Sequence, residues 1–202
     1  MPPSRSRMRR RPGGRSPRGQ FLIFGEGLVT ERAYLSALRS ELRAANMEYT
    51  RVPGNPYNIV SRACAISSRE VAPNDQVWCI FDVESPTPHP RIREALELAA
   101  KNNIQCAVSN PCFELWLYLH RKDGNSFATT SDMEQRLCGI FPAYAKKKTI
   151  GYSLIKDQFD EAKRRARVLE RLHSNPIDPI SCNPTTNVWK LVDSLREFYD
   201  HA

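Results

Sequence analysis

Apolar and polar positions form two alternating kinds of pattern along the first 120 residues. Short apolar runs, of which QVWCIF is the clearest, predict strands buried on both faces at residues 21–24, 48–52, 76–81 and 104–108. Segments with helical periodicity lie between and after them, at residues 30–45, 57–68, 91–102 and 112–120. Thr30 is the expected N-cap of the first helix. Strands that alternate with helices predict a parallel sheet with right-handed crossovers.

The pattern changes after residue 122. A polar segment follows, and then helices are predicted at residues 133–140, 154–172 and 187–199. We expect these helices to pack on the sheet rather than to form an independent domain. The predicted fold class is therefore α/β, with a parallel sheet of about four strands flanked by helices and a helical C-terminal portion.

The N-terminal segment differs in composition from the rest. Residues 1–20 hold seven arginines and no acidic residue, so they carry most of the net charge of +8 and leave residues 21–202 near neutrality. The segment is rich in Pro, Gly and Ser, which predicts a disordered tail before a single domain at 21–202. It is either an arm that binds nucleic acid or another polyanion, or only a solubilising terminus.

The remaining composition indicates a soluble protein of the cytoplasm. Apolar content is 41%, and no apolar run is long enough to cross a bilayer. The run FLIF is too short for the core of a secretory signal. Six cysteines form no C-x-x-C pair, so neither a disulfide framework nor a zinc site is expected.

Carboxylates follow the predicted strands. Glu26 lies between two glycines after the first strand, and Asp82 and Glu84 follow the third. Glu114 comes one helical turn after the Ser-Asn that ends the fourth strand. Because ligands of open parallel sheets bind beyond the carboxyl ends of the strands, we expect these acids to converge if the first and third strands are neighbours and the chain stays extended to Glu84. Oxygen-only ligands select hard ions, so Mg²⁺ or Mn²⁺ is the expected cofactor.

Other interpretations of these residues stay open. Taken singly, each acid is more often solvated than a ligand, and Glu31 is explained equally well as a first-turn acid facing the helix dipole. The Gly-Glu-Gly stretch lacks the third glycine of a dinucleotide fingerprint, and no Gly-Lys-Ser/Thr follows as in a Walker loop.

Several strings in the chain resemble those of the RloB-like family, with which the AbiLii-type abortive-infection proteins are grouped. They extend from about residue 21 to the last helix, and the S-N-P-x-F-E-x-W string is the most specific of them. The strings are Glu26-Gly27-x-x-Thr30-Glu31-x-x-Tyr34, Asp82-x-Glu84, Ser109-Asn110-Pro111-x-Phe113-Glu114-x-Trp116, His120, Tyr144-x-Lys146 and Asn183-Pro184-Thr185-Thr186.

The resemblance implies a Toprim-like domain. Toprim domains place a Glu after the first strand and Asp-x-Asp after the third, around a divalent metal, and they serve in topoisomerases, primases and nucleases. It therefore implies phosphodiester chemistry, a role in bacterial defence against phage, and an ATPase partner of the RloA or AbiLi kind. By this resemblance Glu26 is a metal ligand or general base, and Asp82 and Glu84 are metal ligands. Glu84 departs from the pattern, because Toprim domains carry Asp there.

Each further candidate has two possible roles. Glu114 is an auxiliary acid or a helix residue paired with an arginine. His120 is a proton shuttle or a C-terminal helix cap. Lys146 is an electrophilic helper, as its place in the Tyr-x-Lys string implies, or a solvated loop residue. The basic helix at residues 163–171 either follows a nucleic-acid backbone or faces solvent.

Together these features predict a metal-dependent nuclease acting on DNA or RNA. Two alternatives are a degenerate Toprim-like module that binds nucleic acid or its partner without cleavage, and a primase-like nucleotidyl transferase that needs nucleoside triphosphates.

Overall fold

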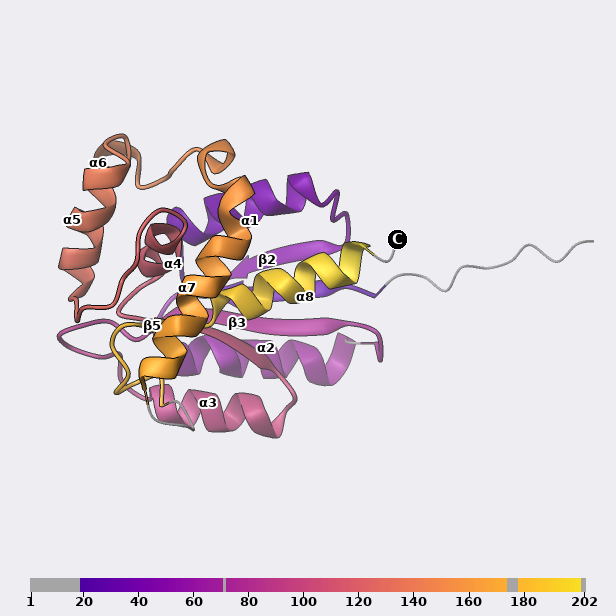
Figure 1. Ribbon diagram of the computed structural model, residues 1–202. Helices are drawn as coiled ribbons and strands as arrows, with labels where there is room; N and C mark the ends of the chain where they lie inside the picture. Colours follow the sequence, from indigo (N-terminus) through magenta and orange to yellow (C-terminus); the bar gives the residue numbers. More distant parts are fainter. Residues whose placement is uncertain (1–18, 71, 174–177, 201–202) are drawn as a thin grey trace, which may run out of the picture.

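The computed structural model describes residues 19–70, 72–173 and 178–200. Within them, one sheet has the strand order β2-β1-β3-β4-β5. Neighbours among β1 to β4 run parallel, and β5 is antiparallel to β4. Figure 1 shows the sheet between layers of helices. The strands are β1 (Phe21–Gly25), β2 (Met47–Arg51), β3 (Gln76–Asp82), β4 (Gln105–Asn110) and β5 (Thr185–Thr186).

The helices follow the predicted order, except that a short helix at Tyr144–Lys147 was not predicted. The helix predicted at 154–172 begins only at Phe159, after two 3₁₀ turns at Tyr152–Leu154 and Lys156–Gln158. The helix predicted from residue 133 begins earlier, because Thr129 and Asp132 form a capping box there. The helices are α1 (Thr30–Glu41), α2 (Pro56–Glu70), α3 (Ile92–Lys101), α4 (Glu114–Leu119), α5 (Thr130–Ile140), α6 (Tyr144–Lys147), α7 (Phe159–Leu172) and α8 (Val188–Asp200).

The α/β class and the four parallel strands are confirmed, and two further details differ from expectation. The short strand β5 was missed, since two residues carry no periodic signal. The prediction that Thr30 caps α1 is wrong: Val29 holds the N-cap position, without a side-chain cap. The Thr30 hydroxyl donates instead to the Lys148 carbonyl, at 2.9 Å.

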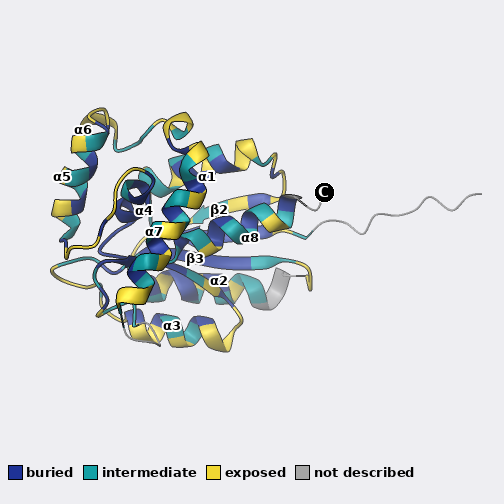
Figure 2. Cartoon of the chain, viewed as in Figure 1, coloured by how far each residue is buried: buried dark blue, intermediate teal, exposed yellow. Residues whose placement is uncertain are grey.

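Successive side chains of the strands enter two separate hydrophobic cores, as the period of a strand requires. Phe21 and Ile23 face one core, and Leu22 and Phe24 face the other. The smaller core is closed by α2 and α3, which lie together below the sheet in Figure 1. Figure 2 shows the exposed positions of these two helices along their outer sides.

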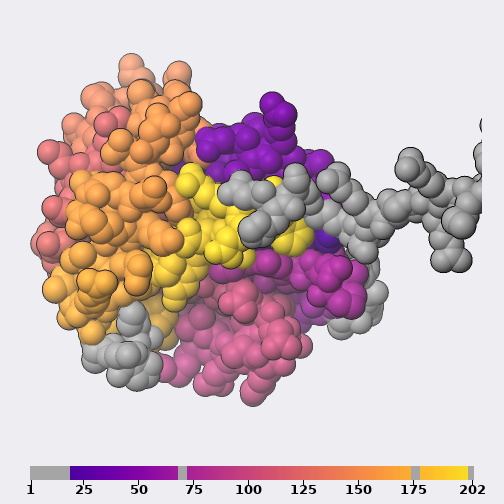
Figure 3. All heavy atoms as spheres, turned by 45° about the vertical axis from the view of Figure 1, so that its right-hand side comes forward, coloured from indigo at the N-terminus to yellow at the C-terminus, as the bar shows by residue number. Residues whose placement is uncertain are grey.

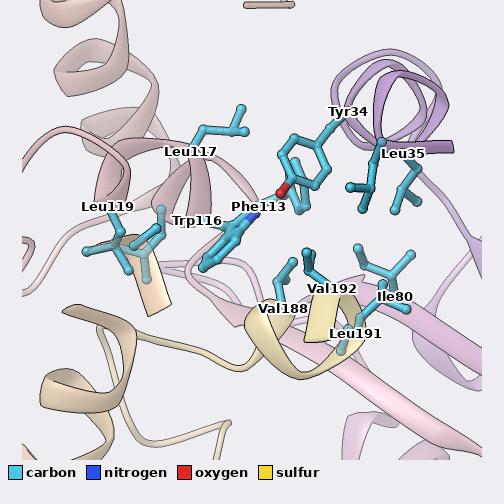
Figure 4. Close-up of a cluster of buried hydrophobic side chains, with 14 of the residues drawn as sticks. Tyr34, Leu35, Ile80, Phe113, Trp116, Leu117, Leu119, Val188, Leu191 and Val192 are labelled. Atoms are coloured by element: carbon cyan, nitrogen blue, oxygen red, sulfur yellow. The ribbon is translucent and has the colours of Figure 1, made fainter. Parts of the chain in front are cut away.

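The larger core unites the sheet with the C-terminal helices. Side chains of α1, α4, α7 and α8 share it with Ile80 of β3, and Figure 4 shows several of them pointing toward one another. Trp116 lies at its centre and is fully buried. The chain beyond residue 122 therefore packs on the sheet.

Three further expectations concern the chain as a whole. All six cysteines are free thiols, as predicted. Among the described helices, none is long and apolar enough to cross a membrane. The predicted disordered tail falls almost wholly on residues 1–18, which lie outside the described residues. Gln20, the last residue assigned to it, donates its backbone N–H to the Asp75 carboxylate at 2.6 Å.

Candidate metal centre

Two strands and two helices bring acidic residues to one edge of the sheet. β1 and β3 are parallel neighbours, as the sequence analysis required. Glu26 follows β1 directly, and Asp82 is the last residue of β3. The first turns of α1 and α4 add Glu31 and Glu114. The two strand ends and the two helix starts thus supply four carboxylates, and Glu84 follows two residues after β3.

The glycines around Glu26 make room for neighbouring side chains. A Cβ on Gly25 would lie 2.8 Å from the Tyr49 hydroxyl, which is too close for any other residue. That hydroxyl donates to the Gly27 carbonyl at 2.8 Å, and the Arg51 guanidinium donates to the Glu26 carbonyl at 3.2 Å. The edge strand β2 thus fixes the loop that carries Glu26.

Glu31 belongs to the acidic group, although its sequence position suggested only a helix-dipole role. Its carboxylate lies over Gly27, where a Cβ would come within 1.8 Å of a carboxylate oxygen. The pKa of Glu31 is raised to about 7, first by burial and then by the charges of Glu114, Glu26 and Glu84. Its place one turn after the strand-end loop was the signal that could have identified it.

Asp82 is the most strongly affected acid. Burial raises its pKa well above the usual range, and the charges of Glu31, Glu114 and Glu84 raise it further. A hydrogen bond from the Phe113 backbone acts in the opposite direction. Because the largest charges acting on Asp82 are all carboxylates, the acids share one electrostatic environment.

Glu84 reaches this group by a different route from the one expected. The chain does not stay extended after β3, because Glu84 has a φ of 70°, in the left-handed region that a residue with a long side chain rarely adopts. The Thr130 hydroxyl at the start of α5 donates to the Glu84 carboxylate at 2.6 Å. The same hydroxyl accepts from the Ser85 backbone at 3.2 Å, so α5 holds this turn in place.

Glu114 is held by a chain of hydroxyl groups. Only 9% of its surface is exposed, and the Tyr144 hydroxyl donates a short hydrogen bond to its carboxylate. The Thr30 hydroxyl lies 3.3 Å from the same Tyr144 oxygen. Residues from α1, α4 and α6 are therefore linked around this carboxylate.

The donor chemistry of this acidic cluster, formed by Glu26, Glu31, Asp82, Glu84 and Glu114, fits a hard divalent cation. These five side chains offer oxygen ligands, and burial together with their mutual repulsion raises the pKa values of Glu31 and Asp82. Within the described part of the chain, no three His, Cys, Asp or Glu side chains are already arranged as a closed metal-binding group.

Comparison with known families agrees with the strings in the sequence. A family described as "RloB-like protein" matches residues 21–195. The chain belongs to the RloB-like family. No curated protein is significantly similar to it. Among solved structures, it resembles a de novo designed Rossmann fold protein at 19% identity and a TM-score of 0.35, over 44% of this chain and 83% of that one.

Two of the predicted catalytic residues make no hydrogen bond or ion pair with the acidic cluster in the described part of the chain. His120 is 2% exposed, and its Nδ1 lies 2.9 Å from the Trp116 carbonyl. Burial lowers its pKa to about 4, and the largest charges acting on it belong to arginines. Lys146 is exposed on α6. The structure thus brings together Glu26, Asp82, Glu84 and Glu114, whereas His120 is buried in the core and Lys146 is exposed.

Three hydroxyl residues that the site analysis of the sequence did not select support the cluster. Thr130 binds Glu84, Tyr144 binds Glu114, and Thr30 binds the lysine-rich turn through Lys148. Tyr144 and Thr30 occurred in the strings that resemble the family, whereas Thr130 gave no signal beyond its place near the start of a helix.

Proposed function

We propose that this protein is a metal-dependent nuclease that hydrolyses phosphodiester bonds in DNA or RNA. The observation that carries the proposal is the acidic cluster at the carboxyl edge of the sheet, where the pKa values of Glu31 and Asp82 are raised mainly by burial and neighbouring carboxylates. Such a concentration of like charge disfavours the ionised state unless a cation compensates it. Membership of the RloB-like family adds the phosphodiester chemistry that the Toprim-like strings imply.

The residues of the cluster suit different tasks. Asp82, Glu31 and Glu84 would hold Mg²⁺ or Mn²⁺, which supplies charge stabilisation at the phosphoryl oxygens when it is bound. Glu114 is oriented by Tyr144 and would position a ligand or a water molecule. Glu26 lies in a partly exposed loop, where its carboxylate would act as a ligand or accept a proton from the attacking water. Lys146 keeps its proposed electrophilic role only if its exposed side chain turns toward bound substrate.

The proposed biological setting is defence against phage together with an ATPase of the RloA or AbiLi kind. This part of the proposal is supported by the resemblance to abortive-infection proteins. Co-expression with such an ATPase and co-purification of the two chains would test the partner.

The activity is tested with purified protein freed of metal by EDTA. Single-stranded and duplex DNA and RNA are incubated with Mg²⁺ or Mn²⁺, with and without the ATPase. We expect cleavage that depends on the metal and is lost in Asp82→Asn. A primed template with nucleoside triphosphates is included, because primer extension without cleavage would identify a nucleotidyl transferase. Metal-independent binding without turnover under every condition would contradict the nuclease and favour a binding module.

A further inference from the structure

The surface formed by α7 and α8 combines positive charge with an accessible aromatic ring. Figure 3 shows the two helices side by side on one face of the molecule, α7 in orange and α8 in yellow. Trp189, in the first turn of α8, is only partly buried. The other two tryptophans, Trp78 and Trp116, are 5% and 0% exposed. Trp189 is therefore the tryptophan that a ligand can reach.

Three cations surround this indole ring. The ammonium groups of Lys163 and Lys190 each lie 5.4 Å from the centre of the ring, and the guanidinium of Arg167 lies 5.9 Å from it. These distances are within the range of cation–π attraction. We call Trp189 with these three residues the Trp189 surface. On α7 its two cations are four residues apart, so they follow one side of the helix.

Two acidic groups touch this surface, and neither forms an ion pair with Arg167 or Lys190 in the described part of the chain. Asp193 pairs with Lys163 at 2.5 Å, and Glu170 accepts the Trp189 indole N–H at 3.1 Å. Among the described residues, no ion pair within 4 Å involves Arg167 or Lys190. The Glu170 bond orients the ring, while the two cations remain available to a negatively charged ligand.

The Trp189 surface begins close to the acidic cluster. Asp82 is opposite Ser109 in the sheet, and Ser109 is opposite Thr186 of β5. Two strand spacings separate Asp82 from Thr186, which is about 10 Å. Trp189 follows Thr186 by three residues. The start of α8 therefore lies near the carboxyl edge of the sheet, where the acids converge.

We propose that the Trp189 surface binds single-stranded nucleic acid, with an unpaired base stacked on the Trp189 indole and phosphates contacted by Arg167 and Lys190. Aromatic rings within a basic groove are the general means of binding single strands without reading their sequence. A duplex keeps its bases paired and stacked, so it cannot offer one to the indole. The inference extends the proposed nuclease and rests on it only in treating the bound strand as substrate.

Intrinsic fluorescence gives a direct test. An unlabelled single strand of roughly 15 nucleotides, which fills about one site of this kind, is titrated into the full chain in EDTA. Stacking on the one partly exposed tryptophan should quench the fluorescence, and a duplex of the same length should not. Equal quenching by the duplex, or none by the single strand, would overturn the proposal. A cleavage assay in Mn²⁺ is run separately: quenching without cleavage refutes only the nuclease, and cleavage without quenching refutes only the surface.

Variants separate the ring from the charges, with binding followed by the anisotropy of a labelled strand. Trp189→Ala should weaken binding about fivefold or more, the loss expected for one stacked base. Trp189→Phe should retain most of the affinity and lose the quenching signal. Arg167→Ala with Lys190→Ala, both at exposed positions, should lower the slope of log affinity against log salt by about 1.4, or 0.7 for each phosphate contact.

The matched control removes two cations elsewhere. Arg62 and Lys101 are exposed on α2 and α3, which cover the other side of the sheet. Arg62→Ala with Lys101→Ala should leave the salt slope unchanged. If this control and the Arg167/Lys190 variant lower the slope equally, binding follows net charge alone and the proposed surface is wrong.

Discussion

Two regions of this protein bury ionisable side chains, and they differ in whether the neighbouring groups stabilise the buried side chain. His120 lies in the aromatic core beside Trp116 and Tyr34, where burial keeps it neutral and the Trp116 carbonyl binds its ring nitrogen. In the acidic cluster, burial is instead combined with repulsion between Glu31, Asp82 and their neighbours. The His120 ring is hydrogen-bonded and neutral, whereas the charges that act on Glu31 and Asp82 all belong to other carboxylates. A buried group that is already satisfied indicates structure, and a set of uncompensated charges indicates a ligand site.

The largest expected effect removes one carboxylate from the acidic cluster. Asp82→Asn keeps the shape of the side chain and loses its charge, so it should lower metal-dependent cleavage about a thousandfold, because a catalytic metal supplies several kcal/mol at the transition state. Mn²⁺ binding, measured by isothermal titration, should fall in parallel. In EDTA the variant should be at least as stable as the parent, since repulsion is relieved.

Glu94→Gln is the control for Asp82→Asn. Glu94 is an exposed acid of α3 that pairs with Arg91, on the side of the sheet without the cluster. It should leave cleavage and Mn²⁺ binding unchanged. Metal binding that survives intact in Asp82→Asn would show that Asp82 is no ligand and that the centre must be redrawn around the other four acids.

Glu31→Gln tests whether the acidic cluster is uncompensated. The pKa of Glu31 is about 7 in the folded protein against 4.5 for an ordinary Glu, so the unfolded chain loses its proton first as pH rises. The free energy of unfolding should therefore fall between these pKa values, by about 3 kcal/mol in all. Glu31→Gln has no such loss. In EDTA its free energy of unfolding should therefore exceed that of the parent by about 3 kcal/mol near pH 8 and equal it near pH 4.

Urea unfolding at the two pH values, without metal, measures this difference. Saturating Mn²⁺ should shrink it, since a bound cation compensates the charge of Glu31 in the parent. A parent protein as stable as Glu31→Gln near pH 8 in EDTA would mean that the cluster already holds a compensating charge.

His120 should show a pH dependence of similar size and opposite direction. Its pKa is about 4 when folded against 6.5 ordinarily, so the unfolded chain takes up the proton first as pH falls. The contribution of the neutral, buried ring to the free energy of unfolding is complete above pH 6.5, the pKa of His120 in the unfolded chain. It should decrease by about 3 kcal/mol as the pH falls to about 4, the pKa in the folded protein. His120→Gln, which cannot titrate there, should lose this decrease while the metal-dependent cleavage of the folded variant persists.

The cleavage rate of His120→Gln decides whether His120 takes part in the reaction. If His120→Gln folds, binds Mn²⁺ as the parent does and yet loses most of its cleavage rate with a changed pH profile, the histidine transfers protons in the reaction. His120 would then have a catalytic role, and the distinction between a structural histidine and an acidic ligand site would not hold.

The sequence could predict the order of elements better than the membership of the site. Apolar runs ended by polar residues identify strands because the sheet is covered on both faces, and the same rule placed Glu26 and Asp82 at one edge. His120 was included because it ends the helix predicted at residues 112–120 and occurs among the strings that resemble the RloB-like family. His120 and Glu114 are six positions apart, which places them about 120° apart around a helix, and only the packing of α4 decides that His120 faces the core.

Glu31 and Glu84 show two further limits. Glu31 joins the acidic cluster because Gly27 leaves space for its carboxylate, a contact between a loop and a helix that has no periodic signature. Glu84 was expected from an extended chain, and it is positioned instead by a left-handed turn and by Thr130, which is 46 residues away. Contacts of this kind depend on tertiary structure and could not be read from local pattern.

The smallest expected effect concerns the hydroxyl that completes the surroundings of Glu114. Tyr144→Phe removes the donor to this buried carboxylate and leaves the ring in the core, so it should destabilise the protein by about 1.5 kcal/mol, as for a hydrogen bond to a charged acceptor. If Glu114 must be held in one orientation to act, cleavage should fall about tenfold with little change in Mn²⁺ affinity, since orientation is lost and charge is kept. Tyr118→Phe on α4 is the matched control and should leave cleavage unchanged, because that tyrosine lies on the same helix as Glu114 and is only partly buried. Equal cleavage by parent and Tyr144→Phe, together with the expected loss of stability, would make Tyr144 a residue of the core alone, and the acidic cluster would then act without the hydroxyl groups that surround it.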